Sequence, residues 1–307
     1  MKKIAIATLL AAASMVASAQ VSVSGKVAEF IDNTKTGAVS KTSIAGEPTN
    51  NITVSVTEAL GNGLKARAVI DTSLGTNSIN GGSYTQFGDR QGTVGLVSSM
   101  GSVDIGRNVH SEFLAITNND VFGTMYGSVA GDVHNLRGLR LSNGVFATVT
   151  PVKGVTVSYD RTQGNTGVEA SSYSATGSFA GVTATAARFA QGADVSTVVA
   201  ANTKIGNTQV TYIHSDDAVA NMWIGIMGAG TRVSKSTGDS VGVAQSFGPI
   251  TAKASYGRTN TKVTAYSAGI GYALSKRTDV EVAYRNVNAV GTSNDVAQVG
   301  VGVIHRF

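Results

Sequence analysis

The segment VTAYSAGIGYALSKRTDVEVAYRNV, residues 263–287, decides the fold class. Up to Leu274, apolar side chains stand at every second position, with small or polar residues between them. After the polar turn at 275–277 the alternation resumes, now with charged residues between the apolar ones. A period of two places successive side chains on opposite faces of a β-strand. The segment therefore predicts two neighbouring strands, each with one apolar and one polar face.

The same alternation runs through most of the chain after Gln20, and no helical period accompanies it. We predict an all-β protein of about sixteen antiparallel strands, an even number typical of outer-membrane barrels. The predicted strands cover residues 21–31, 51–59, 63–73, 88–97, 102–107, 137–150, 154–160, 171–179, 182–190, 196–205, 208–215, 238–247, 250–258, 263–274, 278–287 and 295–307.

Short and long connections alternate along the chain. The short ones include 61–63, 98–101, 151–154, 180–181, 206–207, 248–249 and 275–277, and the long ones include 32–50, 74–87, 108–136 and 216–237. Bacterial outer-membrane barrels have this arrangement, with short periplasmic turns and long extracellular loops.

The distribution of charge favours a transmembrane barrel over a soluble one. One face of many strands carries ionic residues, namely Lys26, Lys65, Arg67, Asp71, Asp104, Arg140, Lys253, Asp279, Glu281 and Arg285. A barrel of about sixteen strands is too wide to be filled by side chains, so its interior holds water. The charged face then lines the water and the apolar face meets lipid, where a closed sheet satisfies every backbone group. A large β-sandwich, a β-helix or an adhesin would also alternate, although no solenoid repeat is present.

The first 19 residues have the features of a secretory signal peptide. Lys2 and Lys3 precede an apolar run at 4–13, and Ala17-Ser18-Ala19 forms a small-residue cleavage site. We therefore expect a signal peptide at 1–19 and a barrel domain at 20–307. The alternative is a buried amino-terminal helix of a cytosolic protein.

Composition agrees with an exported membrane barrel. Charged residues make up only 14% of the chain, and cysteine is absent, which excludes disulfides and thiolate metal sites. The formal charge of +5 includes Lys2 and Lys3, and no lysine- or arginine-rich block is present, so nucleic acid is not an expected partner.

Four stretches resemble the Gram-negative porin family of the β-proteobacterial type. They are TEALGNGLKA at 57–66, DRQGTVGLVSSMGSVDIGR at 89–107, LSNGV at 141–145 and the terminal HRF at 305–307. The resemblance spans nearly the whole mature chain. It implies a homotrimeric, sixteen-stranded diffusion channel in the Gram-negative outer membrane. Such a channel passes small hydrophilic solutes and ions, is not an enzyme and needs no cofactor or metal.

In that family the third extracellular loop folds into the lumen and narrows it, facing basic residues on the wall. Here the resemblance implies a pore-constricting loop at 108–135, a length that calls for a function. Its acidic candidates are Glu112, Asp120 and Asp132. The basic candidates opposite are Lys26, Lys65, Arg67, Arg107, Arg137 and Arg140. Relatives often hold arginine at two positions that are Asn51 and Gln91 here, so we expect only a weak anion preference.

Two other functions remain open. His214-Ser215-Asp216-Asp217 is similar to the groups used by some barrel proteases, although an exposed loop explains it better. An outer-membrane barrel acting mainly as an adhesin or structural surface protein is the second alternative. The four histidines are scattered, and neither a zinc motif nor an EF-hand loop is present.

Overall fold

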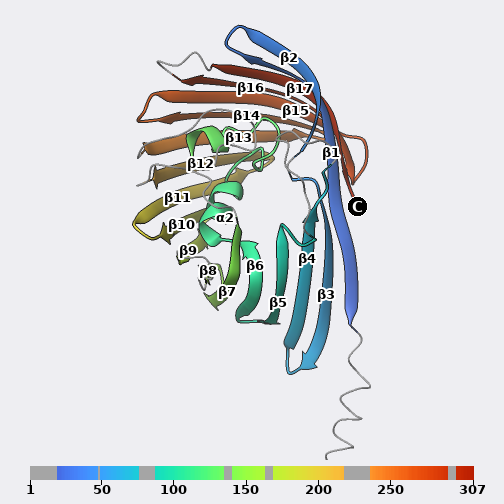
Figure 1. Ribbon diagram of the computed structural model, residues 1–307, viewed down its shortest axis with the longest axis vertical. Helices are drawn as coiled ribbons and strands as arrows, with labels where there is room; N and C mark the ends of the chain where they lie inside the picture. The colour runs from blue at the N-terminus through green and yellow to red at the C-terminus, as the bar shows by residue number, and fades with distance from the viewer. Residues whose placement is uncertain are drawn as a thin grey trace, which may run out of the picture.

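The computed structural model describes residues 19–47, 49–75, 87–134, 140–162, 169–217, 236–289 and 295–307. Its strands form one closed antiparallel sheet, wrapped around a segment that holds two short helices (Figure 1). The strands are β1 (Gln20–Thr36), β2 (Val39–Gly46), β3 (Asn51–Gly61), β4 (Leu64–Ser73), β5 (Gln91–Ser98), β6 (Gly101–Val109), β7 (Arg140–Val152), β8 (Val155–Thr162), β9 (Ala170–Phe179), β10 (Val182–Gln191), β11 (Asp194–Ile205), β12 (Thr208–Asp217), β13 (Ser236–Phe247), β14 (Ile250–Thr259), β15 (Val263–Ala273), β16 (Thr278–Ala289) and β17 (Val296–Arg306). The helices are α2 (Ser111–Thr117) and α3 (Ala130–Val133), and neither is long and apolar enough to cross a membrane.

The sheet has sixteen strand positions because β2 and β3 share one of them. Along one edge β1 pairs with β17, and this pairing closes the barrel. Along its other edge, residues 20–26 of β1 pair with β3 and residues 29–36 pair with β2. The predicted closed sixteen-stranded barrel is therefore confirmed.

At the break between β2 and β3, the side chain of Asn50 forms hydrogen bonds with β1. The Asn50 side chain accepts a hydrogen bond from the Ala28 amide at 2.8 Å and donates one to the Ala28 carbonyl at 3.0 Å. The Glu47 amide donates to the same Ala28 carbonyl at 3.0 Å, so the carboxamide adds to the backbone bonding of β1 at this point.

The prediction of a loop at 32–50 is wrong. In the structure β1 continues to Thr36, turns at Gly37, where φ is +57°, and returns as β2. This hairpin was missed because polar residues occupy both of its faces. Side chains hold it together instead: Asn33 Nδ2 donates to Thr42 Oγ1 at 2.9 Å, and Ser40 Oγ donates to Asn33 Oδ1 at 3.0 Å.

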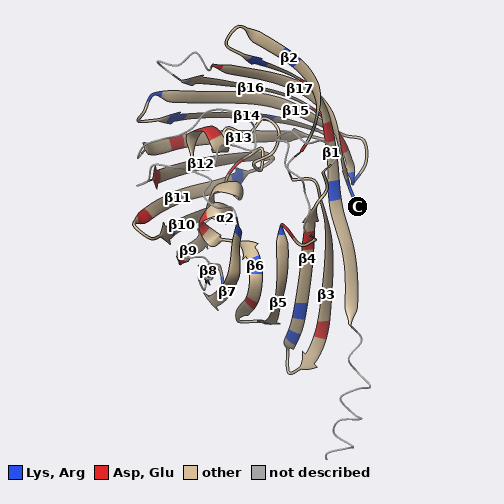
Figure 2. Ribbon diagram, viewed as in Figure 1, with Lys and Arg blue, Asp and Glu red and all other residues tan. Residues whose placement is uncertain are grey.

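Apolar side chains point out of the barrel and polar ones point in. β17 lies between β16 and β1. Its Val299, Val301 and Val303 are exposed, whereas its Gln298 points the other way and is buried. Charged residues are sparse and are separated by long uncharged stretches of strand (Figure 2). Exposed valines around a polar interior are the reverse of a soluble fold and match a wall that meets lipid.

The closing seam depends on the end of the chain. Gly25 N donates to the Phe307 carbonyl at 3.0 Å, and Phe307 N donates to the Gly25 carbonyl at 3.1 Å. The Phe307 ring lies over Gly25, where any Cβ would collide with it and with the Asn51 carbonyl.

We predict that Gly25→Val destabilises the folded barrel by about 1–3 kcal/mol, because the new side chain displaces the Phe307 ring. Urea unfolding followed by tryptophan fluorescence and gel mobility measures the effect. Gly177→Val is the matched control, since a Cβ at Gly177 meets nothing within 4 Å. Equal stabilities of the two variants would contradict the proposed role of this contact.

Candidate functional site

The segment 110–134 packs against the inner face of the strands. The ring of His110 caps α2 by accepting a hydrogen bond from the Phe113 amide at 3.3 Å. α2 contacts β8–β11 and α3 contacts β13–β15. Ile116 lies in an apolar cluster with Val198 and Ile213, and Val133 lies in another with Ala265 and Val287.

The same segment also reaches the opposite side of the wall. The Tyr126 ring stacks on Phe30 of β1, with centroids 4.3 Å apart and ring planes 5° from parallel. The Tyr126 amide donates to Glu47 Oε1 at 2.5 Å. Burial raises the pKa of the Tyr126 phenol well above its ordinary value, and the nearby Asp32 charge acts in the same direction, so the phenol stays neutral. Gly300 leaves room for this ring, because a Cβ there would overlap it.

Two of the three acidic candidates attach the segment to the wall, and the third stabilises a turn within it. Glu112 is fully buried and accepts a hydrogen bond from Ser196 Oγ of β11 at 2.5 Å. Asp132 forms an ion pair with Arg285 Nη1 of β16 at 3.2 Å, and both side chains are buried. Asp120 accepts from the Thr124 amide at 2.7 Å and so stabilises a turn within the segment. That these carboxylates line a constriction stays a prediction.

Three basic candidates lie on the inner face of the wall. Arg67 Nε donates to Asp104 Oδ1 at 3.3 Å, and its Nη2 forms an ion pair with the same carboxylate. Lys65 lies two residues earlier on that face and is exposed. Lys26 Nζ contacts Thr49 Oγ1 and lies 2.9 Å from Met125 Sδ, between the wall and the inner segment.

The other basic candidates have different positions. Arg140 is the first residue of β7 and is half-buried, and Arg137 lies outside the described residues. Arg107 lies near the end of β6 and is half-buried. There its Nε donates to the Asp89 carbonyl at 2.7 Å. That Arg107 belongs to the inner wall stays a prediction.

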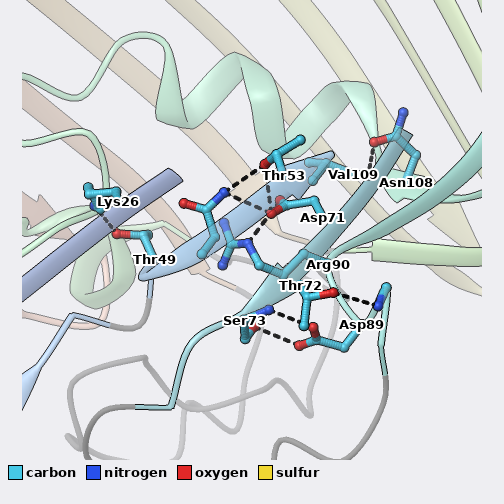
Figure 3. A network of polar contacts seen from close by, with 12 residues as sticks. Lys26, Thr49, Thr53, Asp71, Thr72, Ser73, Asp89, Arg90, Asn108 and Val109 are labelled. Atoms are coloured by element: carbon cyan, nitrogen blue, oxygen red, sulfur yellow. Dashed lines mark hydrogen bonds and ion pairs between the residues drawn. The ribbon is translucent and has the colours of Figure 1, made fainter. Parts of the chain in front are cut away.

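A polar network on β3–β5 was missed from the sequence (Figure 3). Asp71 accepts from Asn51 Nδ2 at 2.7 Å, from Thr53 Oγ1 at 3.0 Å and from Arg90 Nε at 3.0 Å. Asp89 accepts from the Ser73 amide at 2.7 Å and from Ser73 Oγ at 2.6 Å. The adjacent charged residues Asp89 and Arg90 were the feature of the sequence that could have indicated this network. Asn51 here orients a carboxylate that binds Arg90.

The protease-like residues 214–217 do not come together in one site. Strand alternation turns Ser215 and Asp217 inward, where both are buried, and turns His214 outward. On the outer face, His214 Nδ1 lies 2.9 Å from Asp239 Oδ1 of β13. Within the described ranges no cluster of three or more metal-ligating side chains occurs.

Comparisons with known proteins agree with this architecture. A family model described as Gram-negative porin matches residues 6–306. Among the curated proteins no match was found.

Solved structures with the same fold include three porins. An anion-selective porin from Comamonas acidovorans has a TM-score of 0.76 at 17% identity, covering 94% of this chain and 100% of that one. Salmonella typhi OmpF in complex with daunomycin has a TM-score of 0.72 at 17% identity, covering 94% and 97%. A triple mutant of the Rhodopseudomonas blastica porin has a TM-score of 0.68 at 18% identity, covering 94% and 100%. At these identities the similarity concerns the fold.

We predict that Asp132→Asn loosens the inner segment, because it leaves the buried Arg285 guanidinium without its counter-charge. Breaking such a buried pair costs roughly 3–5 kcal/mol. Hydrogen exchange of the amides at 111–134 should accelerate accordingly. Glu169→Gln is the control, since its pair with Arg161 is exposed and its loss costs less than about 1 kcal/mol. Unchanged exchange in Asp132→Asn would show that the pair does not hold the segment.

Proposed function

The chain belongs to the Gram-negative porin family, and from this premise we propose that it forms a water-filled outer-membrane channel for passive diffusion of small hydrophilic solutes and ions. One observation carries the proposal. A closed sheet of sixteen strand positions turns its polar and ionic side chains inward and its valines and tyrosines outward. An interior of this width and polarity holds water.

The segment 110–134 narrows this channel in our proposal. Its contacts with both sides of the wall support the idea, since α2 packs on β8–β11 while Tyr126 packs on β1. A segment fixed at both sides cannot swing out of the channel without breaking several buried contacts. It therefore sets the size limit for solutes.

We propose a weak preference for anions. Lys65 and Arg67 place cationic groups on the inner wall, while the carboxylates of Glu112 and Asp132 are withdrawn into buried contacts. The ion pairs of Arg67 with Asp104 and of Lys253 with Glu281 keep the net potential small. The similarity in fold to an anion-selective porin agrees with this sign. Fixed charges in a narrow pore bias the ions that pass it.

Export and assembly complete the proposal. Residues 1–18 lie outside the described ranges, and we propose that 1–19 are a cleaved leader. Amino-terminal sequencing of the purified protein should begin at Gln20, and retention of Met1 would contradict cleavage. We further propose a homotrimer as the functional unit.

Planar-bilayer recording tests the channel directly. We expect large ohmic steps that occur in groups of three for a trimer. Absence of conductance from correctly folded protein would favour an adhesive or structural barrel, and turnover of lipid or peptide would favour an enzyme.

We predict that Arg67→Ala shifts the reversal potential in a KCl gradient toward cation preference, because it removes a wall cation and leaves the Asp104 carboxylate uncompensated. Arg188→Ala is the control, since Arg188 lies over the Tyr173 ring on the outer face of β10. A shift of equal size in both variants, or in neither, would remove Arg67 from the selectivity mechanism.

A further inference from the structure

Cationic side chains without a counter-charge gather at one end of the barrel. The short turns that follow β3, β5, β7, β9, β11, β13 and β15 lie together at that end, which we call the short-turn mouth. These turns contain Lys153, Lys276 and Arg277 and no acidic residue. Lys65 at the start of β4 and Lys204 at the end of β11 lie at the same mouth. All five side chains are exposed, and among the described residues none of them has an ion-pair partner.

The carboxylates near the short-turn mouth do not offset this charge. Three of them form ion pairs with other cations of the same end: Asp104 with Arg67, Asp279 with Arg306 and Glu281 with Lys253. A fourth, Glu58, is the register partner of Ala66, which points to the opposite face of β4 from the inward Lys65. An excess of positive charge therefore remains at this mouth.

The other mouth carries charges of both signs. Its exposed ionic residues at or near strand ends include Lys35, Lys41, Lys262, Glu169, Asp216 and Asp295. Cations and carboxylates on one rim largely offset each other in the potential that an approaching ion meets. The axis of the barrel therefore runs from a positive mouth to a mixed one.

The five unpaired cations surround the opening instead of lying on one side of it. They belong to β4, the β7–β8 turn, β11 and the β15–β16 turn, which are spread around the closed sheet. Lys204 points inward, because it has the parity of the buried Val198 and Ala200 in a strand without a register shift. Fixed charges around an aqueous opening raise the local concentration of ions of opposite sign.

We propose that these five residues, the short-turn cations, collect small anions at the short-turn mouth, so that the channel conducts more when anions enter through this mouth. The inference rests on the proposed channel function and adds a site of anion selection that is separate from the segment 110–134. Near that segment the carboxylates and cations largely compensate each other, whereas the short-turn cations act on the entering ion without compensation. The channel thereby becomes a rectifier as well as a filter.

Single-channel recording at two salt concentrations tests the rectification. At about 0.1 M KCl, where the Debye length is about 10 Å, we expect the current to differ by about two-fold between opposite voltages of equal size. At about 1 M KCl, where the Debye length is about 3 Å, the two currents should become equal. Equal currents already at the low concentration would overturn the inference, while the conductance itself would leave the proposed channel intact.

The direction of the asymmetry requires channels of known orientation. The chain has no cysteine, so Ser99→Cys in the exposed β5–β6 turn gives a single thiol at the short-turn mouth without altering its charge. After biotinylation and recording, streptavidin added to one chamber binds only channels whose short turns face that chamber. We expect the larger current when anions move from the short-turn side to the other side, and the opposite direction would overturn the inference.

Neutralising the two mouths separately tests which residues are responsible. The triple variant Lys153→Gln, Lys276→Gln, Arg277→Gln should lose most of the rectification and part of the anion preference. The matched control is Lys35→Gln, Lys41→Gln, Lys262→Gln, which removes the same charge from exposed residues of the other mouth and should keep or increase the rectification. Equal losses in both triple variants would assign the effect to total charge and overturn the inference. An unchanged conductance at about 1 M KCl shows that each variant still forms the barrel.

Discussion

The backbone of a membrane-spanning sheet has no water to bond with, and the architecture of this protein follows from that constraint. Each unpaired backbone group in hydrocarbon costs several kcal/mol, so the sheet must close. Here closure requires β1 to pair with β17 on one side and with two successive strands on the other. Once the cylinder is closed, the two-residue period assigns every strand side chain to lipid or to the interior. The polar lining is therefore a consequence of closure combined with alternation.

Many of the charged side chains inside the barrel form ion pairs or hydrogen bonds that stabilise the structure. Glu112 and Asp132 hold the inner segment to the wall, and Arg67 and Arg90 are each matched by a carboxylate on the same side of the barrel. A channel whose fixed charges are largely compensated has a small net field. The nearly balanced composition of the chain agrees with that arrangement.

The strands, their order and the assignment of faces could be predicted from sequence because they depend on local alternation. The β1–β2 hairpin could not, since polar residues on both faces leave no period. The attachments of the inner segment could not be predicted either, because Glu112 and Ser196 are 84 residues apart and meet only through the fold.

The Asn50 side chain forms hydrogen bonds with β1 at the break between β2 and β3. It bonds to both the amide and the carbonyl of Ala28, and the Glu47 amide donates to the same carbonyl at 3.0 Å. The Glu47 carboxylate accepts from the Tyr126 amide of the segment 110–134. A local irregularity in the wall thus lies beside a hydrogen bond that holds the segment 110–134.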